Sequence, residues 1–200
     1  MLKIGLTGGI GSGKTIVSQI FKTIGIPIFC ADIEAKKTYS DSKIREQIIN
    51  LFGEKIYMNN TDIDKQMLAS KIFGDRQMLE KVNSIIHPAV HIYFEKWFAE
   101  QKSPYIIHEA AILLESGFAK FMDKIIVVNA PQNLRIKRIM ARGGQSYQQI
   151  IKRMKNQMHD EERNAHADFI INNDENVPLL PQVLKIHEEL SKYGNYPKNS

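Results

Sequence analysis

The chain has 200 residues and a formal net charge of +5; 43% of its residues are hydrophobic and 24% are charged. This composition is ordinary for a globular protein of one or two domains with a full hydrophobic core. The single cysteine, Cys30, excludes an intrachain disulfide, and no apolar run reaches the roughly 20 residues that a membrane span needs. We therefore expect a cytoplasmic protein with no membrane partner.

Residues 8–15, Gly-Gly-Ile-Gly-Ser-Gly-Lys-Thr, match the phosphate-binding loop G-x-x-x-x-G-K-[ST]. A short buried strand over 2–7 precedes the loop and apolar residues at helical spacing follow it, which is the context that this motif requires. The glycines let backbone N–H groups approach phosphate oxygens, Lys14 suits the β and γ phosphates, and the Thr15 hydroxyl suits Mg²⁺. The residues expected to bind a nucleoside triphosphate here are Gly8, Gly9, Gly11, Ser12, Gly13, Lys14, Thr15 and Ile16.

The first helix is expected over 13–24, ending at Gly25, and a second strand over 26–31. Asp32 follows that strand directly. Ligands of open α/β sheets bind outside the carboxyl ends of the strands, so Asp32 is a candidate for a place close to the phosphate loop. Asp is also a common helix N-cap, and the local sequence leaves both interpretations open.

Residues 33–101 are helical in pattern. The spacing predicts a helix ending at Gly53, another capped by Thr61 or Asp62, and a long amphipathic stretch over 76–98 broken by Pro88, with a kink near His87. About 70 residues between two strands is far more than a crossover requires, so we expect an inserted helical subdomain for a second substrate. His87 is either a packed residue or a ligand contact.

Three further strands are expected over 105–109, 124–129 and 168–172. The first of them ends in Glu109, a carboxylate placed to hold Mg²⁺ directly or through water. Between the last two strands, a helix over 132–140 is followed by Gly143-Gly144 and a polar helical stretch over 147–165 that carries several arginines. This stretch is either a solvated charged face or a mobile lid that closes over the triphosphate, and the glycine pair favours the lid.

These elements predict an α/β fold with a five-stranded parallel sheet of the P-loop NTPase type and helices on both faces. The strand order is not fixed by the sequence. The expected organisation is a nucleotide-binding core of 1–32, 102–141 and 166–193, a helical acceptor-binding insert of 33–101, a helical lid of 142–165 and a polar tail of 194–200.

The ordered motifs resemble those of the dephospho-coenzyme A kinases, a family of P-loop kinases. Cys30-Ala31-Asp32 stands where the family has Asp-Ala-Asp, and Arg142-Gly143 where it has Arg-Asp. Ala111 replaces the proline of the family's Pro-Leu-Leu-x-Glu. The other matching segments are Leu6–Thr15, Asn83-Ser84-Ile85-Ile86-His87-Pro88, Gln157 and Ala167–Asn173.

The resemblance implies ATP-dependent phosphorylation of the ribose 3′-hydroxyl of dephospho-CoA, the last step of coenzyme A synthesis, with Mg²⁺. It implies that Asp32 accepts or orients the acceptor hydroxyl, and that Lys14 and Arg142 act at the phosphates during transfer. His87 is expected to contact the acceptor and Asn173 the nucleotide. The expected partners are small molecules, and a monomer is expected.

Three alternatives remain. Another small-molecule P-loop kinase, such as one acting on nucleoside monophosphates, would share the loop. A regulatory GTPase would carry an Asn-Lys-x-Asp pattern, which is absent from the sequence. A nucleic-acid-binding ATPase would fit the positive charge, but the basic residues concentrate over 135–163, where the lid accounts for them, so we expect no nucleic-acid partner.

Overall fold

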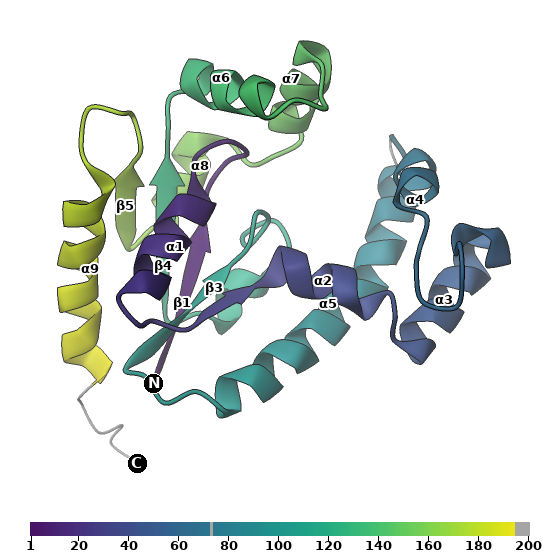
Figure 1. Ribbon diagram of the computed structural model, residues 1–200, viewed down its shortest axis with the longest axis horizontal. Helices are drawn as coiled ribbons and strands as arrows, with labels where there is room; N and C mark the ends of the chain where they lie inside the picture. The colour runs from purple at the N-terminus through teal and green to yellow at the C-terminus, as the bar shows by residue number, and fades with distance from the viewer. Residues whose placement is uncertain (73, 195–200) are drawn as a thin grey trace. The chain divides into compact units, whose positions relative to one another are not determined.

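The computed structural model describes residues 1–72 and 74–194, and it divides into two compact units. We call Met1–Cys30 with Gln101–Ser200 the core, and Ala31–Glu100 the insert. Figure 1 labels their helices and strands. Residues 195–200 of the predicted polar tail lie outside the described residues.

The core contains a five-stranded parallel sheet, which confirms the predicted fold class. The strands are β1 (Leu2–Thr7), β2 (Ile28–Cys30), β3 (Tyr105–Glu109), β4 (Lys124–Asn129) and β5 (Phe169–Asn172). Their order across the sheet is β2-β3-β1-β4-β5. The strand that leads into the phosphate-binding loop is therefore the central one, and its Leu6 pairs in register with Glu109 of β3.

The second strand is shorter than the predicted 26–31. The N–H of Ile26 bonds to the carbonyl of Phe21 at the end of the first helix, so Ile26 continues the helix terminus. Pro27 has no N–H to give to a neighbouring strand, although its carbonyl accepts from Ile107. Ladder pairing therefore begins at Ile28.

Helices cover both faces of the sheet. The helices of the core are α1 (Lys14–Thr23), η2 (Phe118–Phe121), α6 (Gln132–Arg142), α7 (Tyr147–Lys155), α8 (Asp160–Ala165) and α9 (Leu179–Gly194). On one face, Val17 and Phe21 of α1 and Val183 of α9 bury against Ile4 and Leu6 of β1 (Figure 1). On the other face Gly5 admits Leu113, because a Cβ at Gly5 would collide with that side chain.

The insert consists of helices. They are α2 (Ala31–Thr38), α3 (Ser42–Phe52), η1 (Glu54–Ile56), α4 (Lys65–Ile72) and α5 (Arg76–Ala99). The predicted break at Pro88 is wrong, because α5 runs through it as one helix of 24 residues. Proline removes a single N–H, and three buried side chains at four-residue spacing, Ile86, Val90 and Phe94, hold the helix on both sides of it.

Two other predicted boundaries change. The cap of α4 is Asp64 rather than Thr61 or Asp62, since its Oδ1 accepts from the N–H groups of Gln66 and Met67, both at 2.9 Å. The polar stretch 147–165 forms two helices, α7 and α8, rather than one. Gly53 ends α3 as predicted, with φ of +81°. Within the described ranges, every helix is too short or too polar to cross a bilayer.

Candidate active site

The phosphate-binding loop connects β1 to α1. Gly11 and Gly13 have φ values of +79° and +97°, in the left-handed region that glycine adopts most readily. A Cβ on Gly9 would collide with the Arg135 guanidinium, and one on Gly13 with the Asn173 amide. Glycine at these positions therefore serves both the turn and the close approach of neighbouring side chains.

Lys14 lies against the loop. Its Nζ donates to the carbonyl of Gly8 at 2.7 Å and to that of Gly9 at 3.5 Å. Gly13 is the N-cap of α1, so the loop leads directly into the positive end of the helix dipole. The arrangement concentrates positive potential at the loop, which suits a phosphate chain.

Thr15 and Glu109, the two residues predicted to hold Mg²⁺, lie side by side, with the Thr15 hydroxyl 3.4 Å from Glu109 Oε1. Glu109 ends β3 and is only 7% exposed. Two neutral hydroxyls, Thr7 Oγ1 and Ser12 Oγ, are buried and lack a hydrogen-bond partner in the described part of the chain. Several oxygen atoms at or near the loop thus have bonding capacity left for a ligand.

These residues fit Mg²⁺. The ion prefers hard oxygen donors, keeps several waters and is usually held by one or two protein groups together with substrate phosphates. Thr15 and Glu109 supply two such groups.

Asn173, a predicted nucleotide contact, supports the loop itself. Its Nδ2 donates to the carbonyl of Ser12 at 2.7 Å, and Arg138 Nη2 donates to the carbonyl and side-chain oxygens of Asn173 at 3.2 and 3.1 Å. The side chain is 6% exposed. Asn173 therefore positions the loop backbone, and the hydrogen bonds from Arg138 hold Asn173 in turn.

Sequence reasoning missed two contacts on the other side of the loop. Gln157 Oε1 accepts from the N–H of Ile10 at 2.8 Å, and Arg135 Nε donates to the carbonyl of Ile10 at 2.9 Å. Arg135 lies in the basic stretch 135–163, whose composition alone does not indicate a loop contact, and the one sequence signal for Gln157 is its match to the family pattern. Arg163, an arginine of the predicted lid, is buried and pairs with Asp160.

Arg142 is the last residue of α6 and is exposed. Gly143 and Gly144 follow with φ values of +72° and +78°, so the chain turns there through two conformations that favour glycine. Glycine at both positions therefore permits the turn between α6 and α7. The approach of Arg142 to a nucleotide stays a prediction.

The insert contains the two remaining candidates. Asp32 is exposed in the first turn of α2, which begins at Ala31, so the N-cap interpretation is wrong. His87 lies half-buried in α5, and burial lowers the pKa of its imidazole, which favours the neutral form at neutral pH. That either residue comes close to the phosphate loop stays a prediction.

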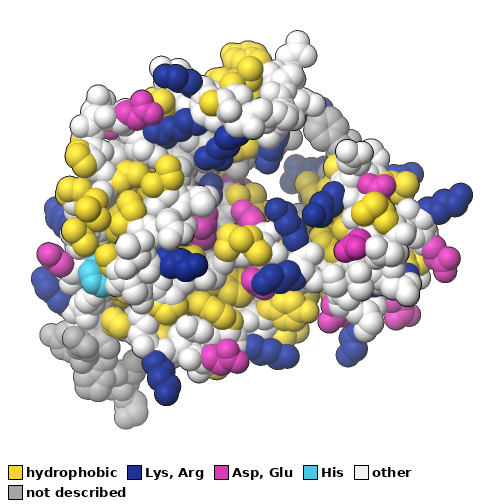
Figure 2. Space-filling model, in the orientation of Figure 1, with side chains coloured by type: hydrophobic (Ala, Val, Ile, Leu, Met, Phe, Trp, Pro, Cys, Tyr) yellow, Lys and Arg dark blue, Asp and Glu magenta, His cyan; other side chains and the backbone are white. Residues whose placement is uncertain are grey.

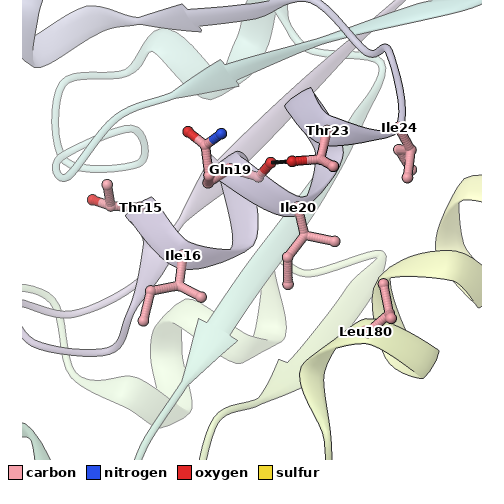
Figure 3. A pocket seen from close by; sticks show the side chains of 7 residues that line it. All are labelled: Thr15, Ile16, Gln19, Ile20, Thr23, Ile24 and Leu180. Carbon is pink, nitrogen blue, oxygen red and sulfur yellow. Dashed lines mark hydrogen bonds between the residues drawn. The ribbon is translucent and has the colours of Figure 1, made fainter.

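An apolar groove of about 460 Å³ runs along α1. Figure 3 shows Ile16, Ile20 and Leu180 lining it, while the Thr15 hydroxyl points away from these side chains. Ile16, a predicted nucleotide contact, is 52% exposed. Hydrophobic side chains gather over α1 and α9 in Figure 2.

The chain is similar to known proteins over nearly its whole length. A family model described as dephospho-CoA kinase matches residues 2–178. A dephospho-CoA kinase of Bacteroides fragilis (strain YCH46) is 41% identical over 187 residues, covering 92% of this chain and 91% of that protein. One of Porphyromonas gingivalis (strain ATCC BAA-308 / W83) is 40% identical over 200 residues, covering 98% of each. The solved dephospho-CoA kinase of Campylobacter jejuni has a TM-score of 0.70 and 26% identity over 97% of this chain and 98% of that one.

Proposed function

The chain belongs to the dephospho-CoA kinase family, and we propose that it transfers the γ-phosphoryl group of ATP to the ribose 3′-hydroxyl of dephospho-CoA. The products are coenzyme A and ADP, and the reaction is the final step of coenzyme A synthesis. The observation that carries the proposal is the loop 8–15 with Thr15 and Glu109 facing each other at its edge, within a chain that matches this family from residue 2 to 178.

The loop binds the β and γ phosphates of ATP. Its backbone N–H groups and the N-terminus of α1 supply positive partial charge, and Lys14 exchanges its contact with the Gly8 carbonyl for the phosphate oxygens. Phosphoryl transfer passes through a loose transition state, so charge stabilisation and positioning contribute more than proton removal. Lys14 therefore acts directly on the charge that develops during transfer.

Thr15, through its hydroxyl, and Glu109, through its carboxylate, would hold Mg²⁺. When bound, the ion neutralises charge on the phosphate oxygens. Glu109 suits the task because it is held by β3, a strand buried along its whole length, and its carboxylate is already directed at Thr15.

The insert binds dephospho-CoA, with His87 among its contacts, and Asp32 accepts or orients the acceptor hydroxyl. Residues 142–165 act as a lid that turns at Gly143-Gly144 and brings Arg142 to the nucleotide. Lid closure excludes water and limits wasteful hydrolysis of ATP. Nothing in this scheme needs a protein or nucleic-acid partner, so we propose a monomer that acts in the cytoplasm, where ATP is available.

A coupled ADP-release assay tests the proposal. Dephospho-CoA is compared with nucleoside monophosphates and other hydroxyl acceptors at equal concentrations, and only dephospho-CoA should support rapid ADP release. Preference for a nucleoside monophosphate would instead make the chain a nucleotide kinase.

The same assay tests Lys14. Lys14→Ala should retain less than about a tenth of the wild-type kcat/KM, a loss of more than about 1.4 kcal/mol of transition-state stabilisation. Lys22→Ala is the matched control, because it removes the same charge from the last turn of the same helix. If the two variants were equally active, Lys14 would have no special role at the phosphates.

A further inference from the structure

Within the phosphate-binding loop the Ser12 N–H donates to the Gly9 carbonyl at 3.1 Å, but the N–H and the carbonyl of Ile10 are held by side chains from outside the loop. Ile10 lies between two glycines, Gly9 and Gly11, and glycine permits many backbone conformations. An anion-binding loop needs its N–H groups turned inward, which leaves carbonyl groups facing outward in need of donors. Side chains from outside the motif therefore have to hold the peptide groups near Ile10.

Two such side chains act on consecutive peptide groups. Gln157 Oε1 accepts from the Ile10 N–H, which belongs to the Gly9–Ile10 peptide, at 2.8 Å. Arg135 Nε donates to the Ile10 carbonyl, which belongs to the Ile10–Gly11 peptide, at 2.9 Å. Rotation of either peptide breaks one of these hydrogen bonds.

Arg135 is the fixed member of the pair. It is 5% exposed, and its Nη1 donates to both carboxylate oxygens of Asp160, at 3.1 and 2.9 Å. Hydrogen bonds between a guanidinium and a carboxylate are charge-assisted and roughly twice as strong as neutral ones, so they hold the Arg135 side chain in place. Arg163, which is 1% exposed, also pairs with Asp160, so two buried arginines hold this carboxylate in place.

Gln157 has a different setting. It is half-buried in the connection between α7 and α8, within the segment 142–165 (Figure 1). The Ile10 N–H that it holds is 147 positions away in the sequence. A neutral amide makes this contact, so the hydrogen bond adds no negative charge beside the phosphates. Gln157 is thus the point where this segment touches the nucleotide-binding loop.

We propose that Gln157 is a positioning residue for the phosphate-binding loop. It holds the Gly9–Ile10 peptide while Arg135 holds the next one, and together they keep the following N–H groups turned toward the phosphates. Because Gln157 lies within 142–165, nucleotide binding and the position of this segment are linked. The inference rests on the proposed binding of ATP phosphates to this loop.

The test replaces Gln157 by leucine, which has a similar volume and no hydrogen-bond acceptor. Gln148→Leu is the matched control, since Gln148 is exposed on α7 in the same segment. Residue-resolved hydrogen exchange reports the Ile10 amide, and calorimetric titration reports the Kd for ADP. Gln157→Leu should speed exchange at Ile10 and weaken ADP binding about 3- to 10-fold, as expected from losing one hydrogen bond, and Gln148→Leu should do neither.

A conservative variant and two further readouts separate positioning from plain structural support. Gln157→Glu keeps an acceptor oxygen and should restore protection of the Ile10 amide. The KM for dephospho-CoA should stay unchanged in Gln157→Leu, and the Tm should fall by no more than about 4 °C.

Equal ADP affinity in the two leucine variants would overturn the proposal. So would a larger fall in Tm accompanied by equal losses toward both substrates, because Gln157 would then only support the fold. If the wild-type protein failed to phosphorylate dephospho-CoA, the proposed function would fail, but the comparison of ADP affinities would still decide the role of Gln157.

Discussion

Among the side chains of the insert, Asp32 is the one whose charge we expect to affect kcat most. It lies exposed in the first turn of α2, directly after the strand β2. Asp32→Asn keeps the shape of the side chain but removes its charge and its ability to accept a proton. Because positioned general bases contribute about 10²–10⁴-fold, and the loose transition state favours the lower part of that range, kcat should fall roughly 10²-fold or more.

Stability separates this role from a structural one. A carboxylate in the first turn of a helix contributes about 0.3–1 kcal/mol, so the Tm of Asp32→Asn should fall only slightly and its affinity for ATP should persist. Glu34→Gln removes a charge from the same turn and is the control. A normal kcat in Asp32→Asn, or a loss of stability together with ATP binding, would remove Asp32 from the reaction.

At the residue scale, the sequence predicts those site residues that a local motif carries. Lys14 and Thr15 follow from the loop pattern, and Glu109 from its place at a strand end. Gln157 and Arg135 could not be assigned in this way, because they contact Ile10 across 147 and 125 positions. The basic residues of a helix next to a triphosphate site would be expected to bind phosphate. In the structure, Arg135 instead donates a hydrogen bond to the backbone carbonyl of Ile10.

The elements α7 and α8 should respond differently to ligands. Asp160 joins α8 to the buried Arg135 of α6 through an ion pair, while α7 follows Gly143 and Gly144, which both have a positive φ. Hydrogen exchange should therefore slow over Tyr147–Lys155 when ATP and dephospho-CoA are added together, with little change over Asp160–Ala165. Mass spectrometry of peptides from the two helices measures this difference.

A backbone variant provides the control. Gly143→Ala strains the connection because φ of +72° with ψ of −176° is a conformation that essentially only glycine adopts, at a cost of about 1–3 kcal/mol. Gly117→Ala also places alanine at φ of +72°, in the milder left-handed region outside this segment, and at both positions a Cβ would meet open space. Turnover should drop in the first variant and not in the second. Equal protection of α7 from hydrogen exchange with and without ligands would contradict the proposal that this segment is a lid.

Element types were predictable where periodicity is strong, and element ends were not. Apolar residues that recur every three to four positions predict α3 and α5, but whether Pro88 ends a helix depends on the packing of Ile86, Val90 and Phe94 around it. Asp64 caps α4, rather than an earlier residue, because an isolated bridge between Tyr57 and Ile63 keeps the chain extended as far as Ile63. These outcomes depend on contacts that a local window does not contain.

For the whole molecule, the two units should respond to different substrates. ADP should give its largest protection from hydrogen exchange in the core, around residues 8–16, and dephospho-CoA in the insert, Ala31–Glu100. A ligand at 100 times its Kd stabilises the folded state by about 2.7 kcal/mol, which is ample for detection. If dephospho-CoA protected the core alone, the insert would not be the acceptor domain.

The strand order β2-β3-β1-β4-β5 determines when the core can form during synthesis. Both β1 and β2 pair with β3. Leu2 can therefore pair only after Tyr105 has been synthesised, and Ile28 only after Ile107. At about 5–20 residues per second, a ribosome needs roughly 4–15 s to add residues 31–104. The inserted segment is therefore fully synthesised before the strand that carries the loop meets its first hydrogen-bonding neighbour.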